Sequence, residues 1–256
     1  GTTFIKANSN TNNIAIGTDA GLTVQGTNAV AVGNSAGSGS QGGSSVAIGH
    51  EAGRVSQNTN SVAIGYQAGL TAQGENAVAI GENTAESAQG VNSTALGVQS
   101  GRYRQGVNSV AVGALAANTD QKAYAVAIGR EAGKTSQNNY AVAMGYVAGQ
   151  NAQGDSSTAV GYQAGRNAQA ANSVAMGKEA ARYSQGGSAV AVGVNAGKTD
   201  QGTNSVAVGS AAGCNAQGAS CVAIGVFAGC ADQGDSAVAV GVNAGCASQS
   251  THAVAV

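Results

Sequence analysis

Basic side chains recur at one position of a repeating pattern, and they are the residues best suited to bind a ligand. Two of them are followed directly by a tyrosine. The set is Arg54, Arg102, Tyr103, Lys134, Arg166, Arg182, Tyr183 and Lys198. An acid stands three residues before some of them, as Glu51 does before Arg54. Two interpretations are open. One is a solvated outer face with weak surface ion pairs. The other is a basic stripe that grips an anionic glycan or a surface protein of a host.

Four cysteines near the C-terminus form the second group of reactive side chains. Cys214, Cys230 and Cys246 share one position of the pattern, and Cys221 occupies another. If consecutive repeats stack, residues at the same position lie about 5 Å apart, which suits the Cα separation of a disulfide. Disulfides within the chain, bridges between chains and free thiols all stay open.

The remaining candidate residues do not favour catalysis or metal binding. No C-x-x-C occurs, and the two histidines, His50 and His252, lie far apart in the sequence. Zinc sites need closer sets of ligands. No Ser/His/Asp set or pair of acids shares a repeat with a plausible base. We therefore expect no metal, no cofactor and no enzymatic activity.

Composition and charge exclude several other classes of protein. The chain has 256 residues with 41 Gly, no Pro and 9% charged residues. Collagen needs Gly at every third position together with Pro, and disordered chains usually carry more charge. A net charge of −1 gives no electrostatic case for nucleic acid. No apolar run reaches the roughly 18 to 20 residues of a membrane span, so we expect no membrane insertion.

A sixteen-residue repeat carries all these side chains, and it runs from about residue 12 to residue 256 without insertion or deletion. In one repeat Val62, Ala63 and Ile64 alternate in size and Gly65 follows them, with Gln73 farther on. An apolar spacing of two residues indicates strands. Two short strands and two turns fit the period. The sequence therefore predicts an all-β fold, a parallel β-solenoid of sixteen-residue coils stacked about 4.8 Å apart. Residues 1–11 are predicted to form a partial coil or cap, in which Phe4 and Ile5 could cover the first layer.

The constant positions of the repeat are expected to build the fold rather than to bind a ligand. Gly65 is expected to end a strand where φ turns positive or a larger residue would clash. The Gln73 position predicts a buried amide that bonds to neighbouring coils. A Gly after it, such as Gly74, predicts a left-handed turn. Either the Val and Ile side chains or the Ala side chains must fill the coil. We favour Val and Ile inside, with an outward Ala strip lining a contact between chains.

One stretch of the repeat, Asn60-Ser61-Val62-Ala63-Ile64-Gly65, resembles the head repeat of YadA-type trimeric autotransporter adhesins. The stretch from Ala63 to Gly69 (A-I-G-Y-Q-A-G) also resembles repeats in fibre proteins of phages and large algal viruses. The resemblance covers nearly the whole chain. It implies a left-handed β-roll, three chains side by side, and a role in surface attachment.

These observations predict an attachment or spacer fibre at an extracellular location, on a cell surface or a virion. A structural filament of chains stacked end to end is the alternative. An ice-binding solenoid is a third hypothesis, since a flat and regular face can order water. It would need a file of threonines at one position of the repeat. The best candidate file is Thr23, Thr71, Thr119, Thr135 and Thr199.

Overall fold

Each sixteen-residue repeat forms one coil of two short strands and two turns. The computed structural model describes residues 5–8 and 12–256. The chain divides into two compact units, unit 1 at Gly1–Ala125 and unit 2 at Val126–Val256. Within each unit the coils stack in parallel, and the described residues contain no helix. The prediction of an all-β parallel solenoid with sixteen-residue coils is therefore confirmed.

Unit 1 contains two sheets, which we call the VAI sheet, after its commonest strand sequence, and the Gln sheet, whose strands end at the glutamine position. Its VAI sheet comprises β1 (Ile5–Asn8), β2 (Asn13–Ile16), β4 (Val30–Val32), β6 (Val46–Ile48), β8 (Val62–Ile64), β10 (Val78–Ile80), β12 (Thr94–Leu96) and β14 (Val110–Val112). Its Gln sheet comprises β3 (Val24–Gln25), β5 (Ser40–Gln41), β7 (Val55–Gln57), β9 (Thr71–Gln73), β11 (Ser87–Gln89), β13 (Tyr103–Gln105) and β15 (Thr119–Gln121).

Unit 2 repeats the same two sheets. Its VAI sheet comprises β16 (Val126–Ile128), β18 (Val142–Met144), β20 (Thr158–Val160), β22 (Val174–Met176), β24 (Val190–Val192), β26 (Val206–Val208), β28 (Val222–Ile224), β29 (Val238–Val240) and β30 (Val254–Ala255). Its Gln sheet comprises β17 (Thr135–Gln137), β19 (Asn151–Gln153), β21 (Asn167–Gln169), β23 (Tyr183–Gln185), β25 (Thr199–Gln201) and β27 (Asn215–Gln217). Parallel bridges at Gln233 and Gln249 continue the Gln sheet.

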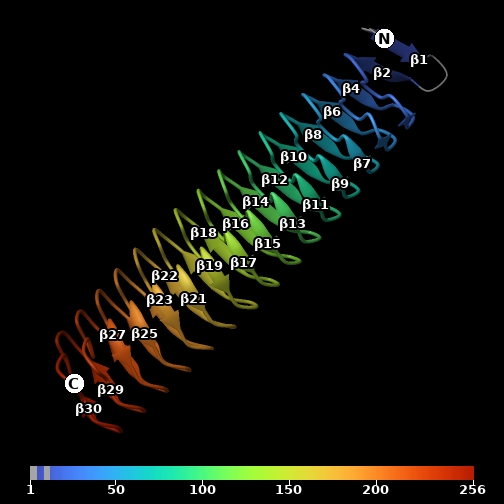
Figure 1. Ribbon diagram of the computed structural model, residues 1–256. Coiled ribbons are helices and arrows are strands. Elements are labelled where there is room, and N and C mark those ends of the chain that lie inside the picture. The colour runs from blue at the N-terminus through green and yellow to red at the C-terminus, as the bar shows by residue number, and fades with distance from the viewer. Residues whose placement is uncertain (1–4, 9–11) are drawn as a thin grey trace. The chain divides into compact units, whose positions relative to one another are not determined.

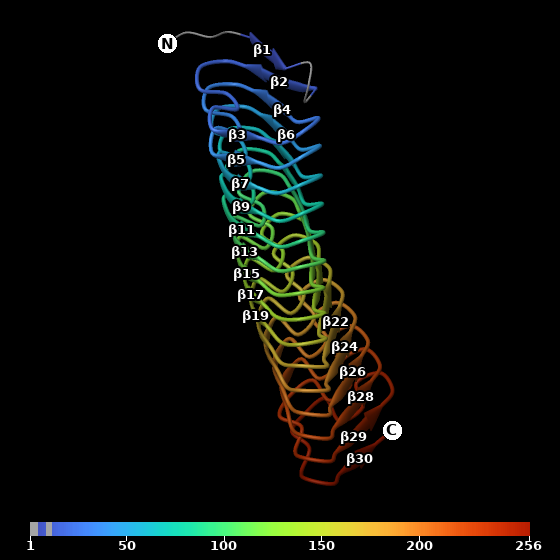
Figure 2. The ribbon, with the colours of Figure 1, turned by 90° about the vertical axis from the view of Figure 1, so that its right-hand side faces the viewer.

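The register keeps equal positions of successive coils in contact. Val62 pairs with Val78, and Ala63 pairs with Ala79. Within each unit, neighbouring strands of one sheet lie side by side (Figure 1), and the two sheets line opposite walls of each coil (Figure 2). At the start of unit 1, β1 pairs antiparallel with β2, with Ile5 opposite Ile16. Phe4, the other residue expected to cover the first layer, lies outside the described residues.

The interior of the coil is filled by small side chains, and here the sequence-based choice between the two faces was wrong. Ala63 is fully buried, whereas Val62 and Ile64 on either side of it are only half-buried. The same alternation recurs along both VAI sheets. The walls of the coil stand too close for a β-branched side chain on both of them. Val and Ile therefore face outward, and Ala faces the opposite wall.

A glutamine bridges the two walls of the coil, and from Gln41 to Gln233 it is buried and is the largest side chain inside. The Gln153 Nε2 atom donates to the Val142 carbonyl on the opposite wall at 2.7 Å. Gln73 Nε2 also reaches Gln89 Oε1 of the next coil, at 3.1 Å. The predicted bonds between amides of neighbouring coils are therefore present in some coils, whereas Gln41 Oε1 and Gln57 Oε1 have no hydrogen-bond partner among the described residues. The shortest bonds run across the coil. Because a buried backbone carbonyl needs a donor, this amide satisfies a group that the ladder leaves open.

The glycines divide into positions that need a positive φ and positions that need only space. Gly65 has a φ of 130°, and a Cβ there would stand 2.5 Å from the Gly81 carbonyl oxygen. Both reasons given for this position from the sequence thus hold. Gly74 was predicted to be left-handed, and this is wrong. It lacks a positive φ, and a Cβ there would lie 2.6 Å from the backbone of Gly90. The left-handed turn residue is instead Asn76, at φ 55°, two positions later.

We predict that Gly145→Ala destabilises the protein and that Gly187→Ala does not. Gly145 has φ 130°, and a Cβ there would lie 2.5 Å from the Gly161 oxygen. Strain of this kind costs about 2 kcal/mol, which should lower the thermal midpoint by about 5 °C. A Cβ on Gly187 would meet its nearest atom at 3.7 Å. Equal midpoints for the two variants in a circular-dichroism melt would contradict this account of the strand-ending glycine.

Candidate functional site

An exposed apolar face runs along the VAI sheet of each unit, and we call it the Val/Ile face. In unit 2 it includes Ile128, Met144, Met176 and Ile224, which are 36 to 44% exposed. In unit 1, Ile48 and Leu96 occupy the same position. Contiguous apolar strips of this kind are unusual on the surface of a soluble monomer and mark interaction sites. The face that the sequence suggested for contact between chains, the Ala side, is buried instead.

The turn that follows each VAI strand, G-x-x-A-G, and the residue directly after it carry most of the charged side chains. In unit 1, Arg54 and Arg102 of the predicted basic stripe directly follow such turns. Arg54 pairs with Glu51 at 2.8 Å. Arg102 pairs with Glu86 of the preceding coil at 2.5 Å and lies over the Tyr103 ring at 4.7 Å. Both cations of this stripe in unit 1 are therefore neutralised by an adjacent acid.

In unit 2 the same positions form a denser network. Glu131 accepts from Lys134 at 3.2 Å and from Gln150 at 2.8 Å. Gln150 in turn accepts from Arg166 at 3.0 Å. Arg166 thus has a neutral partner where Arg54 and Arg102 have an acid.

Glu179 joins two further cations of the predicted stripe in unit 2. It pairs with Arg182 at 3.1 Å and with Lys198 of the next coil at 2.9 Å. The Arg182 guanidinium also lies 4.9 Å from the centre of the Tyr183 ring. The hydrogen bond from Lys198 is the main cause that lowers the pKa of Glu179, although burial opposes it. Two cationic side chains from two successive coils thereby hold one carboxylate.

Sequence reasoning missed the side chains that border this network. Arg130, Tyr146, Tyr162 and Lys178 directly follow the strand-ending glycines of four consecutive coils. The rings of Tyr146 and Tyr162 stack at 5.4 Å, and Arg130 lies 5.7 Å from the centre of the Tyr146 ring. This position varies between repeats, which suggested only an exposed edge. The recurrence of aromatic and basic residues there in adjacent repeats was the signal that could have revealed it.

The cysteines lie in two different environments. The Cys214 thiol contacts the Cys230 carbonyl at 3.2 Å, and the Cys230 thiol contacts the Cys246 carbonyl at 3.2 Å. These three therefore follow one another from coil to coil, as predicted. Cys221 is fully buried, and its thiol donates to the Gly234 carbonyl at 2.9 Å. All four are present as free thiols.

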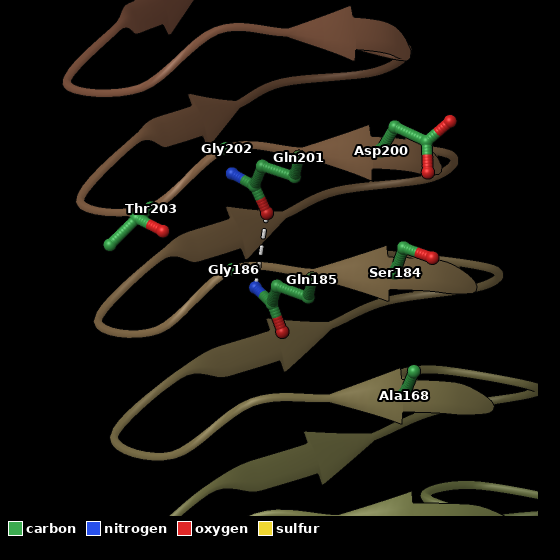
Figure 3. A pocket seen from close by; sticks show the side chains of 8 residues that line it. All are labelled: Ala168, Ser184, Gln185, Gly186, Asp200, Gln201, Gly202 and Thr203. Atoms are coloured by element: carbon green, nitrogen blue, oxygen red, sulfur yellow. Dashed lines mark hydrogen bonds between the residues drawn. The ribbon is translucent and has the colours of Figure 1, made fainter.

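A small pocket opens beside the Gln sheet of unit 2, with a volume of about 360 Å³. Ser184, Asp200 and Thr203 contribute its polar side chains, and Gly186 and Gly202 leave room for it (Figure 3). The Gln185 amide at its base donates to Gln201 Oε1 at 3.1 Å. Since these amides also bond to backbone carbonyls, the pocket is a gap beside the glutamine ladder rather than a built ligand site.

The described part of the chain shows no cluster of three or more His, Cys, Asp or Glu side chains that could hold a metal ion. Among the same residues, no helix is long and apolar enough to cross a membrane. Stacked short strands, an apolar outer face and charged turns are the features of a repetitive structural protein.

Comparison with known families agrees with this class of protein. The model of the YadA head domain repeat matches residues 56–84, 88–101 and 152–180, which lie in both units. The chain therefore carries YadA-like head repeats, and the resemblance seen in the sequence is confirmed for this family. Such repeats and this fold are typical of structural adhesins rather than enzymes. A search of curated proteins finds no match to this sequence.

We predict that the four thiols of the reduced protein react with iodoacetamide in the order of their burial. Cys246 is exposed and should react first. Burial raises the pKa of Cys221 and of Cys214, so less of each is present as the reactive thiolate. Cys221 should react last. Peptide mass spectrometry would measure the order, and in urea the four rates should converge. Early labelling of Cys221 in the folded protein would contradict its placement inside the coil.

We also predict that Lys198→Gln raises the pKa of Glu179 toward its ordinary value, because its strongest hydrogen-bond donor is lost. A folded-state pKa below the unfolded value means that this carboxylate stabilises the fold above the unfolded pKa. The contribution is lost as the pH falls through the folded pKa. NMR titration of the side-chain carboxyl would measure the shift. Lys134→Gln, which changes the partner of Glu131 instead, should leave the Glu179 titration unchanged.

Proposed function

We propose that this chain is a structural and adhesive module of a fibre on a cell or virion surface. In this proposal three copies, each a left-handed β-roll, pack side by side through their Val/Ile faces. The observation that carries it is the exposed apolar face on the VAI sheet. Nothing in the coil itself covers these side chains, and water would otherwise contact them at every repeat.

The energetics of the coil support an assembly of several chains. The interior is built from Ala, Ser and Gln, which bury little apolar surface in each coil. A Met or Ile side chain that moves from water into an interface contributes about 1.5 to 3 kcal/mol. In a single chain the outward Val, Ile and Met side chains stay in contact with water and contribute little of this burial free energy. Side-by-side packing would recover it, and an extracellular location suits an adhesive fibre of this kind.

The ice-binding hypothesis is less well supported. A flat file of threonines that orders water needs free hydroxyl groups. Thr71 Oγ1 donates to the Glu86 carbonyl at 3.0 Å, and Thr119 Oγ1 bonds to Asn118 Oδ1 at 3.2 Å. The tyrosines at 103 and 183 also interrupt the file.

We predict that the isolated chain forms a closed trimer and that Met144→Gln with Met176→Gln disrupts it. Both methionines lie on the Val/Ile face and are 41% and 44% exposed. Light scattering should give three chain masses for the unchanged protein and a lower mass for the double variant. Val194→Gln is the matched control, since Val194 is 45% exposed but lies on the G-x-x-A-G turn.

Two outcomes would contradict the trimer. A monomer at all concentrations would leave the Val/Ile face without the proposed role. A mass that grows steadily with concentration would instead favour chains stacked end to end.

A further inference from the structure

The G-x-x-A-G turns of unit 2 concentrate positive charge on one edge of the coil. We define the turn band as three residues of each coil. They are the two residues between the first glycine and the alanine of this turn, and the residue that directly follows the turn, as in Arg130, Glu131 and Lys134. In unit 2 this band contains six cations and two acids, Glu131 and Glu179. The cations are Arg130, Lys134, Arg166, Lys178, Arg182 and Lys198. They are all the lysines and arginines of unit 2, and the band has a formal excess of four positive charges.

The acids of unit 2 that could balance this charge lie elsewhere. Asp200 lies in the Gln strand β25, Asp155 and Asp235 lie in turns after the glutamine position, and Asp232 directly precedes the bridge residue Gln233. Two of these, Asp232 and Asp235, lie two coils beyond Lys198, the last cation of the band. If a second copy packed beside the first with equal coils aligned, its acids would therefore not lie opposite the cations of the band in every coil.

The exposed fractions give the band an outer surface that is more positive than the formal count suggests. Glu131 and Glu179 are only 15% and 16% exposed, and the cations cover them. Arg130 is 59% exposed, Lys134 and Lys198 are each 33% exposed, and Arg182 is 21% exposed. An approaching ligand would thus meet guanidinium and ammonium groups first.

Unit 1 has the same fold at these positions but the opposite charge. Its turn band contains two cations, Arg54 and Arg102, and four acids, Asp19, Glu51, Glu82 and Glu86. The excess positive charge is therefore not a requirement of the coil. It belongs to the turns of unit 2, and unit 1 provides a natural internal comparison.

The spacing of the cations suits a long ligand with repeated charges. Arg166, Arg182 and Lys198 occupy equal positions in three successive coils, because the strands that follow them pair in register. Neighbouring coils stand about 4.8 Å apart, which is comparable to the length of one sugar residue. Tyr146 and Tyr162 add ring edges and hydroxyl groups next to Lys178. Tyrosine supplies both apolar contact and a hydrogen-bonding group to a ligand.

From these observations we propose that the turn band of unit 2 binds an acidic linear polysaccharide through its sulfate or carboxylate groups. Nucleic acid fits the band less well, because single-stranded bases need open aromatic faces to stack on. One face of Tyr146 is covered by Arg130, and the other lies against Tyr162. The inference goes beyond the proposed fibre function and does not depend on how many chains assemble.

The binding test uses the whole chain and a fluorescent heparin oligosaccharide, with a carboxylate-only polysaccharide of the same length as a second probe. We expect heparin to bind and its affinity to fall at least about tenfold between about 50 mM and 200 mM salt. Binding of both probes identifies charge as the shared determinant, and binding of heparin alone assigns the site to sulfate. Failure of both probes to bind would overturn the proposal, as would equal or tighter binding of a single-stranded oligonucleotide.

Matched variants test the location of the site. Arg166→Gln with Arg182→Gln should weaken heparin binding at least about tenfold. Arg54→Gln with Arg102→Gln removes the same charge from unit 1 and should change it less than about twofold. Glu179→Gln, which releases Arg182 and Lys198 from their acid, should tighten binding roughly threefold. Equal losses in both double variants would show that only total charge matters and would overturn the assignment to unit 2.

Light scattering and thermal melts of the same samples separate this inference from the proposed function. A protein that binds heparin as a monomer would contradict the trimer but not the polysaccharide site. A trimer that binds neither probe would contradict only the site. An unchanged melting midpoint in each variant would show that the loss of binding does not come from unfolding.

Discussion

The narrow interior of the coil, bridged by one glutamine amide, is the constraint on which the rest of the structure depends. Gln153 donates from one wall to the Val142 carbonyl on the other at 2.7 Å, and similar bonds recur in other coils of both units. The amide fixes how far apart the walls stand, because it must reach a carbonyl that would otherwise be buried without a donor. A glycine four residues before the glutamine leaves room for the amide inside the coil. A Cβ at Gly149 would lie 2.7 Å from the Gln153 oxygen.

This constraint decides which apolar side chains face inward. Only Ala fits between the glutamine and the VAI wall, so the larger Val, Ile and Met side chains point away from the coil. A single chain is then held together mainly by ladders of backbone hydrogen bonds and by many small contacts. In a stack of this kind stability is a sum of terms between neighbouring coils. The apolar surface left outside the coil provides a natural contact surface for further chains, which accords with the YadA-like character of the repeats.

The turns carry the differences between the two units. Their backbone conformation is held by glycines and by left-handed residues such as Glu131 and Glu179, but their side chains point outward and can vary without disturbing the fold. Unit 1 places mostly acids at these positions, whereas unit 2 places six cations there. Because coils stack in register, a residue repeated at one position becomes a row of equal side chains. A small change in each repeat therefore produces an extended charged surface.

The sequence by itself determined the repeat and the strands, because both follow from periodicity. It also indicated a buried glutamine at one position and an acid three residues before Arg54, Lys134 and Arg182, although it left open whether these cations pair with the acids or bind a ligand. It could not determine which side of the V-A-I strand faces inward. Alternation of large and small residues is the same in either orientation, and only the distance between the two walls selects Ala. Nor could it reveal that Lys198 shares Glu179 with Arg182, or that Tyr146 and Tyr162 stack. Those contacts join residues sixteen or more positions apart, and only the stacking of coils brings them together.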